Sequence, residues 1–368
     1  MGGSPLPGAP VLLISGIDTD TMEVAAMALA WDLPHAVTVR HDLHPDRGCL
    51  VRTISDITGI IERVELEHGH ACPTCAIRDD VVPTLERLAA DGRWQGVLAQ
   101  LPPTAEPWQV CRALSLAPQD APHVQIAAVV VALSPESLLA DLVGGEPLTE
   151  LDLPVHPDDE RTVSEVACCL VEYADVVFTP DPPDRTEAEI LAALMRPDAQ
   201  LAASVAELDA ALLASGVHRH EDTESWAAYV RRGPLPEHRL TSAWVLDFRS
   251  PLPLHPGRLR QLAPLLGGGP RRSRGCFWLP SRPHHACLWE GAGGRLSVGV
   301  ERSWCRDEPL TRIVVVGIDE GREQLESALR SCLLTPEEVA AQGTLWEVSS
   351  DGLEPWLGPV HQRLQHGM

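Results

Sequence analysis

The sequence predicts an α/β protein, in which a doubly wound, mostly parallel sheet is followed by a smaller α+β domain. Up to about residue 215, short apolar segments alternate with segments of helical periodicity, an order typical of parallel sheets. After residue 237, strand-type segments follow one another with two clear helices between them. A chain of 368 residues is also long enough for two domains of about 100–200 residues each.

The first part opens with a strand, a turn and a helix. Residues 11–15 form an apolar run that ends at Gly16, and residues 21–31 place apolar side chains at helical spacing. The other predicted strands of this part are 36–39, 64–66, 96–101, 126–133 and 175–178, and the other predicted helices are 79–90, 163–173 and 187–195. The alternation predicts that these strands join one sheet.

A change in composition near residue 216 separates the two domains. Residues 216–222 gather histidines and acids, and a Pro-rich loop follows at 233–236. We therefore predict domains at 1–215 and 238–368, joined by a linker at 216–237. The predicted strands of the second domain are 242–249, 275–279, 286–289, 296–300 and 312–316, and its predicted helices are 256–266 and 320–332.

Charge and cysteine usage limit the classes of function. With 29 basic and 52 acidic residues the formal charge is −23, which disfavours broad docking on nucleic acid and favours basic partners. The longest apolar run, at 126–133, is too short to span a bilayer. The ten cysteines form no disulfide framework. We expect a cytoplasmic protein with reduced thiols and no membrane partner.

The glycine and helix after the first strand occupy the place of a phosphate loop. Such a loop needs glycines to curl around phosphates, a lysine, and a Ser or Thr for magnesium. The five corresponding positions here are Gly16, Thr19, Thr21, Met22 and Glu23. Two carboxylates, at positions 18 and 20, would face the phosphates, and the chain contains no lysine at all. We expect a degenerate loop that does not bind GTP.

A second candidate site lies between a predicted strand and a predicted helix. The thiols of Cys72 and Cys75 are three residues apart, and the imidazoles of His68 and His70 precede them. This spacing of soft ligands is typical of zinc sites. The alternative is that the thiols are buried turn residues and the imidazoles are exposed. A further cluster of histidines and acids, at 218–222, fits a solvated linker better than a metal site.

Several segments together resemble the CobW-type GTPases. The resemblance covers most of the chain and is most specific in the second domain. The segments that carry it are 72–88 (CPTCAIRDDVVPTLERL), 96–107, 174–179, 254–259, 274–283, 291–294 and 333–338, with Phe248 and Trp289. The resemblance implies a P-loop NTPase type of first domain, a CobW C-terminal domain and a role connected with zinc.

The sequence departs from the CobW pattern wherever that family handles GTP. The acidic residue at the end of one strand is replaced by Gln100, and a glycine shortly after it by Pro103. The guanine-reading Asn-Lys-x-Asp motif is replaced by residues 180–183, and the chain contains neither asparagine nor lysine. Thr74 takes the place of the middle cysteine of the metal motif. GTPase activity is therefore not expected.

Within this group the chain most resembles the branch called ribosome hibernation factor-recruiting GTPases, or mycobacterial protein Y recruitment factors. That resemblance implies an adaptor that brings a hibernation factor to the small ribosomal subunit when zinc is scarce. The alternative is a GTP-dependent zinc metallochaperone of the CobW family. A third hypothesis makes Cys72 and Cys75 a zinc sensor, in which metal release switches recruitment on.

The candidate partner-binding residues are Arg271, Arg272 and Arg274. They follow three glycines, so we expect a mobile, exposed loop. Arginine is often an interface anchor, and this stretch is locally basic in an acidic protein. The alternatives are a solvated surface and a direct contact with RNA.

Overall fold

The computed structural model describes residues 8–44, 47–67, 76–151 and 159–360. Within this part, the chain folds as two compact units. The first holds the residues up to Leu138, together with Glu146–Asp184 and Leu194–Ala227, and the second holds Leu139–Gly145, Arg185–Ala193 and the residues from Ala228 on. Two short segments of the first half thus group with the second unit, which the predicted boundaries do not anticipate.

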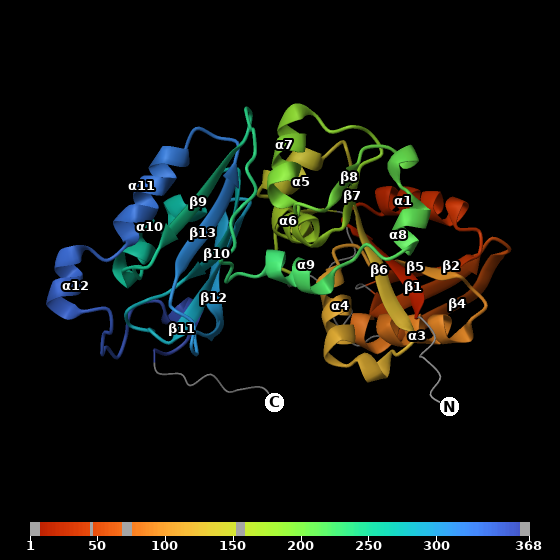
Figure 1. Ribbon diagram of the computed structural model, residues 1–368, viewed down its shortest axis with the longest axis horizontal. Coiled ribbons are helices and arrows are strands. Elements are labelled where there is room, and N and C mark those ends of the chain that lie inside the picture. The colour runs from red at the N-terminus through yellow and green to blue at the C-terminus, as the bar shows by residue number, and fades with distance from the viewer. Residues whose placement is uncertain (1–7, 45–46, 68–75, 152–158, 361–368) are drawn as a thin grey trace. The chain divides into compact units, whose positions relative to one another are not determined.

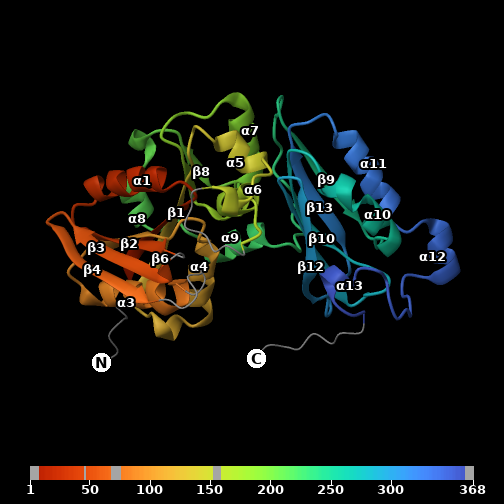
Figure 2. The same ribbon diagram turned by 180° about the vertical axis from the view of Figure 1, so that it is seen from behind.

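The first unit is built on an eight-stranded sheet with the order β4-β3-β2-β5-β1-β6-β7-β8. Its strands are β1 (Ala9–Gly16), β2 (Ala36–His44), β3 (Cys49–Asp56), β4 (Gly59–Glu67), β5 (Gly96–Gln100), β6 (Val124–Ala132), β7 (Val176–Phe178) and β8 (Gln200–Ala202). From β2 to β8 every neighbouring pair is parallel. Strands β3 and β4 add an antiparallel hairpin at one edge (Figure 2). The predicted mostly parallel sheet is confirmed.

Helices cover both faces of this sheet. The helices of this unit are α1 (Thr19–Asp32), a π-helical turn (Ile77–Val81) that runs into α3 (Val82–Asp91), α4 (Pro107–Leu116), α6 (Val163–Tyr173), α8 (Ala210–Ala214) and α9 (His220–Ala227). Helices α5 (Leu138–Val143) and α7 (Arg185–Leu194) lie almost entirely in the segments that group with the second unit. Short 3-10 turns occupy Pro118–Asp120, Leu148–Glu150 and Val205–Glu207. Helices α1 and α8 lie on one face, and α3, α4 and α6 lie on the other (Figure 1). Among the described residues, none of the helices has both the length and the apolar character needed to cross a bilayer.

The predicted linker at 216–237 contains helix α9, which packs against α6. Thr223 is fully buried, and the indole of Trp226 donates a hydrogen bond to the Leu194 carbonyl at 3.0 Å. Of the polar residues that made this segment resemble a linker, Glu221 and Asp222 lie on the exposed side of the helix. Helix α9 therefore occupies part of the predicted linker, whose boundaries stay a prediction.

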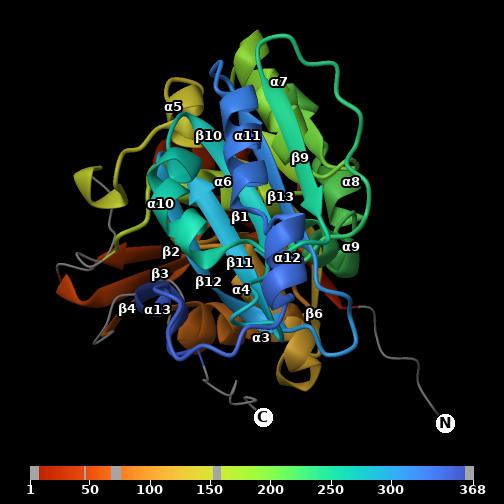
Figure 3. The same cartoon turned by 90° about the vertical axis from the view of Figure 1, so that its left-hand side faces the viewer.

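The second unit contains a five-stranded antiparallel sheet with the order β12-β11-β10-β13-β9. Its strands are β9 (Trp244–Ser250), β10 (Arg271–Phe277), β11 (His285–Ala292), β12 (Arg295–Ser303) and β13 (Thr311–Gly317), and its later helices are α10 (Pro256–Gly267), α11 (Arg322–Cys332), α12 (Pro336–Gln342) and α13 (Glu354–Leu357). Helices α10 and α11 cross one face of the sheet (Figure 3). Phe277 and Trp289, both buried, meet edge to face beneath them. The predicted α+β class is confirmed.

Candidate functional site

The connection between β1 and α1 stands where the sequence predicted a phosphate loop. It consists of Ile17 and Asp18, because β1 ends at Gly16 and α1 begins at Thr19. The Asp18 carboxylate caps the helix: it accepts hydrogen bonds from the Thr21 backbone N–H at 2.8 Å and from the Thr21 hydroxyl. A cap of this kind stabilises a helix by about 1 kcal/mol. The amide end of α1 is thus engaged by a carboxylate of the chain itself.

The predicted loop positions Thr19, Thr21, Met22 and Glu23 all lie within α1. Met22 is fully buried in the core between α1 and the sheet. Glu23 forms an ion pair with Arg40 of β2. Among the residues that stand in place of the later glycines, the lysine and the magnesium ligand, Thr21 therefore serves helix capping, Met22 core packing and Glu23 an ion pair.

Gly16 has a packing reason to be a glycine. A Cβ atom at this position would collide with the carbonyl oxygen of Ala132 on β6, and it would lie 2.9 Å from the Met22 side chain. Contacts this short are not tolerated in folded proteins. The close approach of β1, β6 and α1 therefore accounts for this residue without a ligand.

Hydrogen bonds connect the loop after β5 to the end of β1. The Thr104 backbone N–H donates to the Gly16 carbonyl at 2.9 Å, and the Ser15 hydroxyl donates to the Ala105 carbonyl at 2.6 Å. Thr104 adopts a φ of 65°, which is uncommon for a residue other than glycine. Gln100, which stands where the sequence pattern places an acidic residue, is buried. The ends of β1 and β5 are held together by the chain's own hydrogen bonds.

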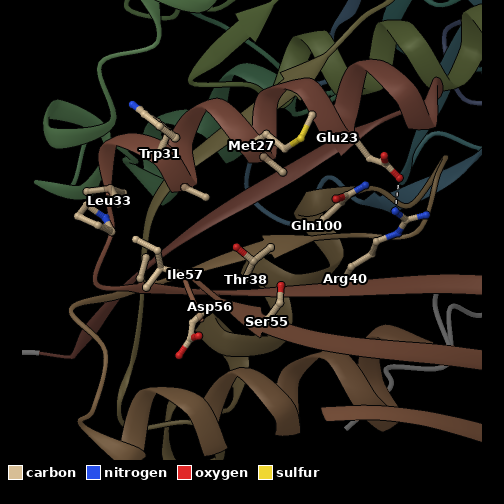
Figure 4. Close-up of a pocket in the computed structure, with 14 residues that line it drawn as sticks. Glu23, Met27, Trp31, Leu33, Thr38, Arg40, Ser55, Asp56, Ile57 and Gln100 are labelled. Carbon is tan, nitrogen blue, oxygen red and sulfur yellow. Dashed lines mark hydrogen bonds and ion pairs between the residues drawn. The ribbon is translucent and has the colours of Figure 1, made fainter. Parts of the chain in front are cut away.

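A pocket of about 610 Å³ opens between α1 and strands β2, β3 and β5 (Figure 4). Met27, Trp31 and Ile57 line it although they are 64%, 86% and 78% exposed, so one wall is apolar and open. The ion pair between Glu23 and Arg40 closes one end. The volume and lining fit a small apolar molecule or an apolar side chain.

A buried pair of ionisable residues lies on the opposite face of the same strands. His41 of β2 is 1% exposed, and its Nε2 is 3.0 Å from Oδ2 of Asp80, which belongs to the π-helical turn before α3. The His41 Nδ1 atom is buried and has no hydrogen-bond partner among the described residues. The sequence prediction missed this pair. The sequence feature that points to it is a histidine at an inward position of β2, between the buried residues Val39 and Leu43.

Arg52 of β3 completes the surroundings of Asp80. Its guanidinium forms an ion pair with the other oxygen of the Asp80 carboxylate, and it also binds Glu62 at 2.7 Å. Burial alone would raise the pKa of Asp80, but the hydrogen bond with His41 and the charge of Arg52 hold that pKa below its usual value. Asp80 is therefore an ionised carboxylate whose two oxygens are both occupied.

The predicted zinc ligands His68, His70, Cys72 and Cys75 lie outside the described residues. The described residues contain no group of three or more His, Cys, Asp or Glu side chains that could hold a metal ion. On the two sides of this segment, Glu67 pairs with Cys49 of β3, and Ala76 is fully buried.

The three candidate partner-binding arginines are not in a loop. Arg271, Arg272 and Arg274 belong to strand β10, in the middle of the second sheet. The Arg271 side chain lies 2.5 Å from the carboxylate of Asp319, and the guanidinium of Arg272, 2% exposed, forms an ion pair with Glu290.

Arg274 stacks over the ring of Tyr229, with 4.5 Å between the guanidinium carbon and the ring centroid. The expectation of a mobile, exposed cluster is wrong, because acidic and aromatic residues distant in the sequence neutralise and cover these side chains. A partner-binding role for them stays a prediction.

The cluster of histidines and acids at 218–222 is also less exposed than expected. The His218 side chain is 4% exposed, and its Nδ1 lies 2.9 Å from a carboxylate oxygen of Asp175. Asp175 is ionised, since hydrogen bonds from His218 and Arg196 lower its pKa against the raising effect of burial. Tyr173 and His220 pack their rings near the imidazole, with centroids 6.1 and 6.2 Å away. His218 is therefore a core residue.

Comparison with known proteins identifies the second unit. Residues 242–333 match the family profile described as the cobalamin synthesis protein cobW C-terminal domain. The match begins just before β9 and ends just after α11. The resemblance of this part to CobW proteins, predicted from the sequence, is confirmed.

Two relatives of the whole chain carry names that mention zinc. The zinc chaperone Rv0106 of Mycobacterium tuberculosis is 28% identical over 327 residues, which cover 84% of this chain and 77% of that protein. The zinc-regulated GTPase metalloprotein activator 1 of Dictyostelium discoideum is 19% identical over 340 residues, covering 81% and 70%. Among solved structures, the Zn(II)-bound YjiA GTPase from E. coli aligns with a TM-score of 0.36 and 14% identity over 89% of this chain and all of that one.

Proposed function

We propose that this chain is a zinc-binding protein of the CobW type that works without binding or hydrolysing GTP. The zinc role rests on two relatives named for zinc handling and on the CobW C-terminal domain of the second unit. The proposed absence of GTP binding and hydrolysis rests on the geometry of the first unit. Zinc is then either the ion that the protein delivers or the ion that it senses, and zinc release does not depend on hydrolysis of a phosphate bond.

One observation carries the second half of this proposal. A phosphate loop works because free backbone N–H groups and a lysine converge on the phosphates. Here the Asp18 carboxylate occupies the amide end of α1, and Met22 is buried where the lysine would project. A phosphate at this helix end would meet a like charge instead of free donors.

The direct test is a titration of the purified protein with a fluorescent GTP analogue in the presence of magnesium. We expect no saturable binding at micromolar protein concentrations, with or without zinc, and no release of phosphate. Micromolar binding that unlabelled GTP displaces, with magnesium-dependent turnover, would overturn the proposal. It would favour the second candidate, a GTP-dependent zinc metallochaperone, which the name of the Dictyostelium relative supports.

The partner of this protein is a further part of the proposal. The predicted partners are the small ribosomal subunit and a ribosome hibernation factor. The charge of −23 favours basic proteins over nucleic acid as the direct contact. The predicted contact is the arginine cluster of strand β10, and the alternative contact is the first unit around residues 72–80.

A pull-down with the full chain from zinc-starved and zinc-replete host cells tests the partner. We expect proteins of the small subunit and a hibernation factor to be enriched from the zinc-starved cells. A zinc sensor additionally requires that the double variant Cys72→Ser with Cys75→Ser captures them in both conditions. Equal recovery of these proteins by an unrelated acidic bait would refute the adaptor role while leaving zinc binding untouched.

A further inference from the structure

The pocket between α1 and strands β2, β3 and β5 has a polar floor. Thr38 of β2 lies directly opposite Ser55 of β3, and Arg40 of β2 lies opposite Gln100 of β5. Alternate residues of a strand point to the same face, so Thr38 and Arg40 both reach the pocket from β2. All four side chains line the pocket (Figure 4).

Three of these polar side chains have no partner in the part of the chain that the structure describes. The hydroxyls of Thr38 and Ser55 and the amide of Gln100 make no hydrogen bond with any described residue. Gln100 is 4% exposed, and buried polar groups in folded proteins are nearly always hydrogen-bonded. Each of the three groups can both donate and accept a hydrogen bond, so together they offer a polar edge to a bound molecule.

The opposite wall of the pocket is apolar. Met27 and Trp31 are four residues apart on α1 and therefore lie on the same face of the helix. Leu33 and Ile57 lie with Trp31 at the end of the pocket far from Arg40 (Figure 4). An exposed indole beside apolar side chains suits stacking against a flat ring.

The charged groups of the pocket are already engaged within the chain. Arg40 forms ion pairs with Glu23 and Asp42, and the Asp56 carboxylate accepts hydrogen bonds from the Thr58 backbone N–H at 2.8 Å and from its hydroxyl at 2.6 Å. An anionic ligand would meet two carboxylates and a cation that is already paired. A cationic ligand would have to displace Arg40 from Glu23 or lie at the partly exposed Asp56, where an ion pair contributes little. An uncharged ligand needs no counter-charge.

We propose that this pocket binds an uncharged, planar heteroaromatic molecule, whose ring stacks on Trp31 and whose polar edge bonds to Thr38, Ser55 and Gln100. The volume of about 610 Å³ falls within the range of about 300–1,000 Å³ that is typical of small-molecule sites. No residue of 16–22 lines the pocket, so this site is distinct from the degenerate phosphate loop. The inference does not depend on the zinc function.

Ligand-observed NMR of the full chain with three bicyclic probes tests the chemistry of the ligand. Quinazolinone is neutral and carries an amide edge, naphthalene has a similar shape without polar groups, and naphthoate carries a negative charge. We expect saturable binding of quinazolinone. The other two should bind more weakly by roughly 10-fold or more, because naphthalene leaves the polar groups unpaired and naphthoate brings a charge without a counter-charge.

Substitutions in the pocket locate the binding site. Thr38→Val, Ser55→Ala and Gln100→Leu each remove a polar group with little change in volume, and each should weaken quinazolinone binding by roughly 3- to 10-fold. Trp31→Ala removes the stacking surface and should weaken it by a similar factor. The matched control is Trp356→Ala, which removes an exposed tryptophan of the second unit and should leave the affinity unchanged.

The stability of Gln100→Leu separates a ligand-binding amide from a structural one. A buried amide without a partner in the chain destabilises the ligand-free protein, so its replacement by leucine should leave the full chain at least as stable in urea unfolding. A marked loss of stability would mean that the amide bonds within the chain, which contradicts its assigned role. Circular dichroism establishes that every variant folds.

Equal binding of all three probes would indicate an apolar surface suited to a side chain of a partner protein, and the inference would fail. It also fails if folded Thr38→Val and Trp31→Ala bind quinazolinone as tightly as the wild type, since the probe then binds elsewhere. Absence of saturable quinazolinone binding to the wild type at millimolar concentrations would refute it outright. None of these results changes the proposed zinc function, because none of the measurements involves zinc.

Discussion

Replacing Met22 by lysine is expected to destabilise the first unit by several kcal/mol and to create no GTP binding. The substitution restores the residue type of a phosphate loop, but the Met22 side chain is fully buried beneath α1. A lysine there either loses its charge or pulls the helix away from the sheet, and both cost far more than an ordinary surface substitution.

Urea unfolding of the full chain measures this effect, and titration with fluorescent GTP measures binding. Met22→Leu is the matched control, because a swap that conserves volume usually costs less than about 1.5 kcal/mol. A stable Met22→Lys protein that binds GTP with magnesium would contradict both the burial of this side chain and the proposed loss of the nucleotide step.

Asp351→Ala is expected to destabilise the second unit by about 3–5 kcal/mol, because it leaves a buried guanidinium without its counter-charge. The side chains of Arg282 and Asp351 are 2% and 1% exposed, and Arg282 Nε donates to the carboxylate at 2.8 Å. Arg282 also donates to the carbonyls of Leu357 and Gly358, at 2.9 and 2.7 Å. The pair therefore ties the chain around α13 to the connection between β10 and β11.

Chemical denaturation followed by tryptophan fluorescence measures this loss. Glu326→Ala removes one partner of an exposed ion pair in α11 and should change stability by no more than about 0.5 kcal/mol. A similar small effect of Asp351→Ala would mean that the Arg282 guanidinium is solvated.

The same pair predicts how the stability of the second unit depends on pH. Burial alone would raise the pKa of Asp351, but hydrogen bonds from Arg282 and Ser281 hold it below its usual value. The contribution of this carboxylate is present above the pKa of an unfolded aspartate, about 4, and is lost as the pH falls through the lower native value. Asp351→Ala should flatten this part of the stability profile.

Local patterns were sufficient to predict most of the fold. The predicted helix at 163–173 coincides with α6, and the apolar runs at 11–15 and 126–133 lie in β1 and β6. These segments are buried on a helical face or along a whole strand, so their periodicity reflects their packing directly. The five strands of the second sheet all overlap predicted ones, and β9, β10, β11 and β13 contain buried residues that produce the same signal.

Edge elements were harder to predict. Strand β3 was missed, and only residues 64–66 of β4 were predicted. Along β4, charged residues alternate with apolar ones and none of the nine residues is fully buried, because this strand forms the edge of the sheet. A strand that is partly exposed to solvent has few buried apolar residues, so its hydrophobic pattern in the sequence is weak.

The polar contacts were the least predictable part of the candidate site. Asp80 is 39 residues from His41 in the sequence, and Asp319 is 48 residues from Arg271. No local pattern contains such pairs, so a locally basic stretch resembles an exposed surface, and an inward histidine resembles any other core residue. Only the fold brings each charge to the opposite charge that permits its burial.

The tight packing around Gly16 has a consequence for how such chains diverge. The lysine position holds Met22 and the later glycine positions hold Thr19 and Thr21, so this part of the loop pattern is lost. The first glycine is different, because any side chain there would collide with Ala132 and Met22 whether or not a nucleotide is ever bound. Selection for folding alone preserves it, so in descendants of a GTPase this glycine marks ancestry and not activity.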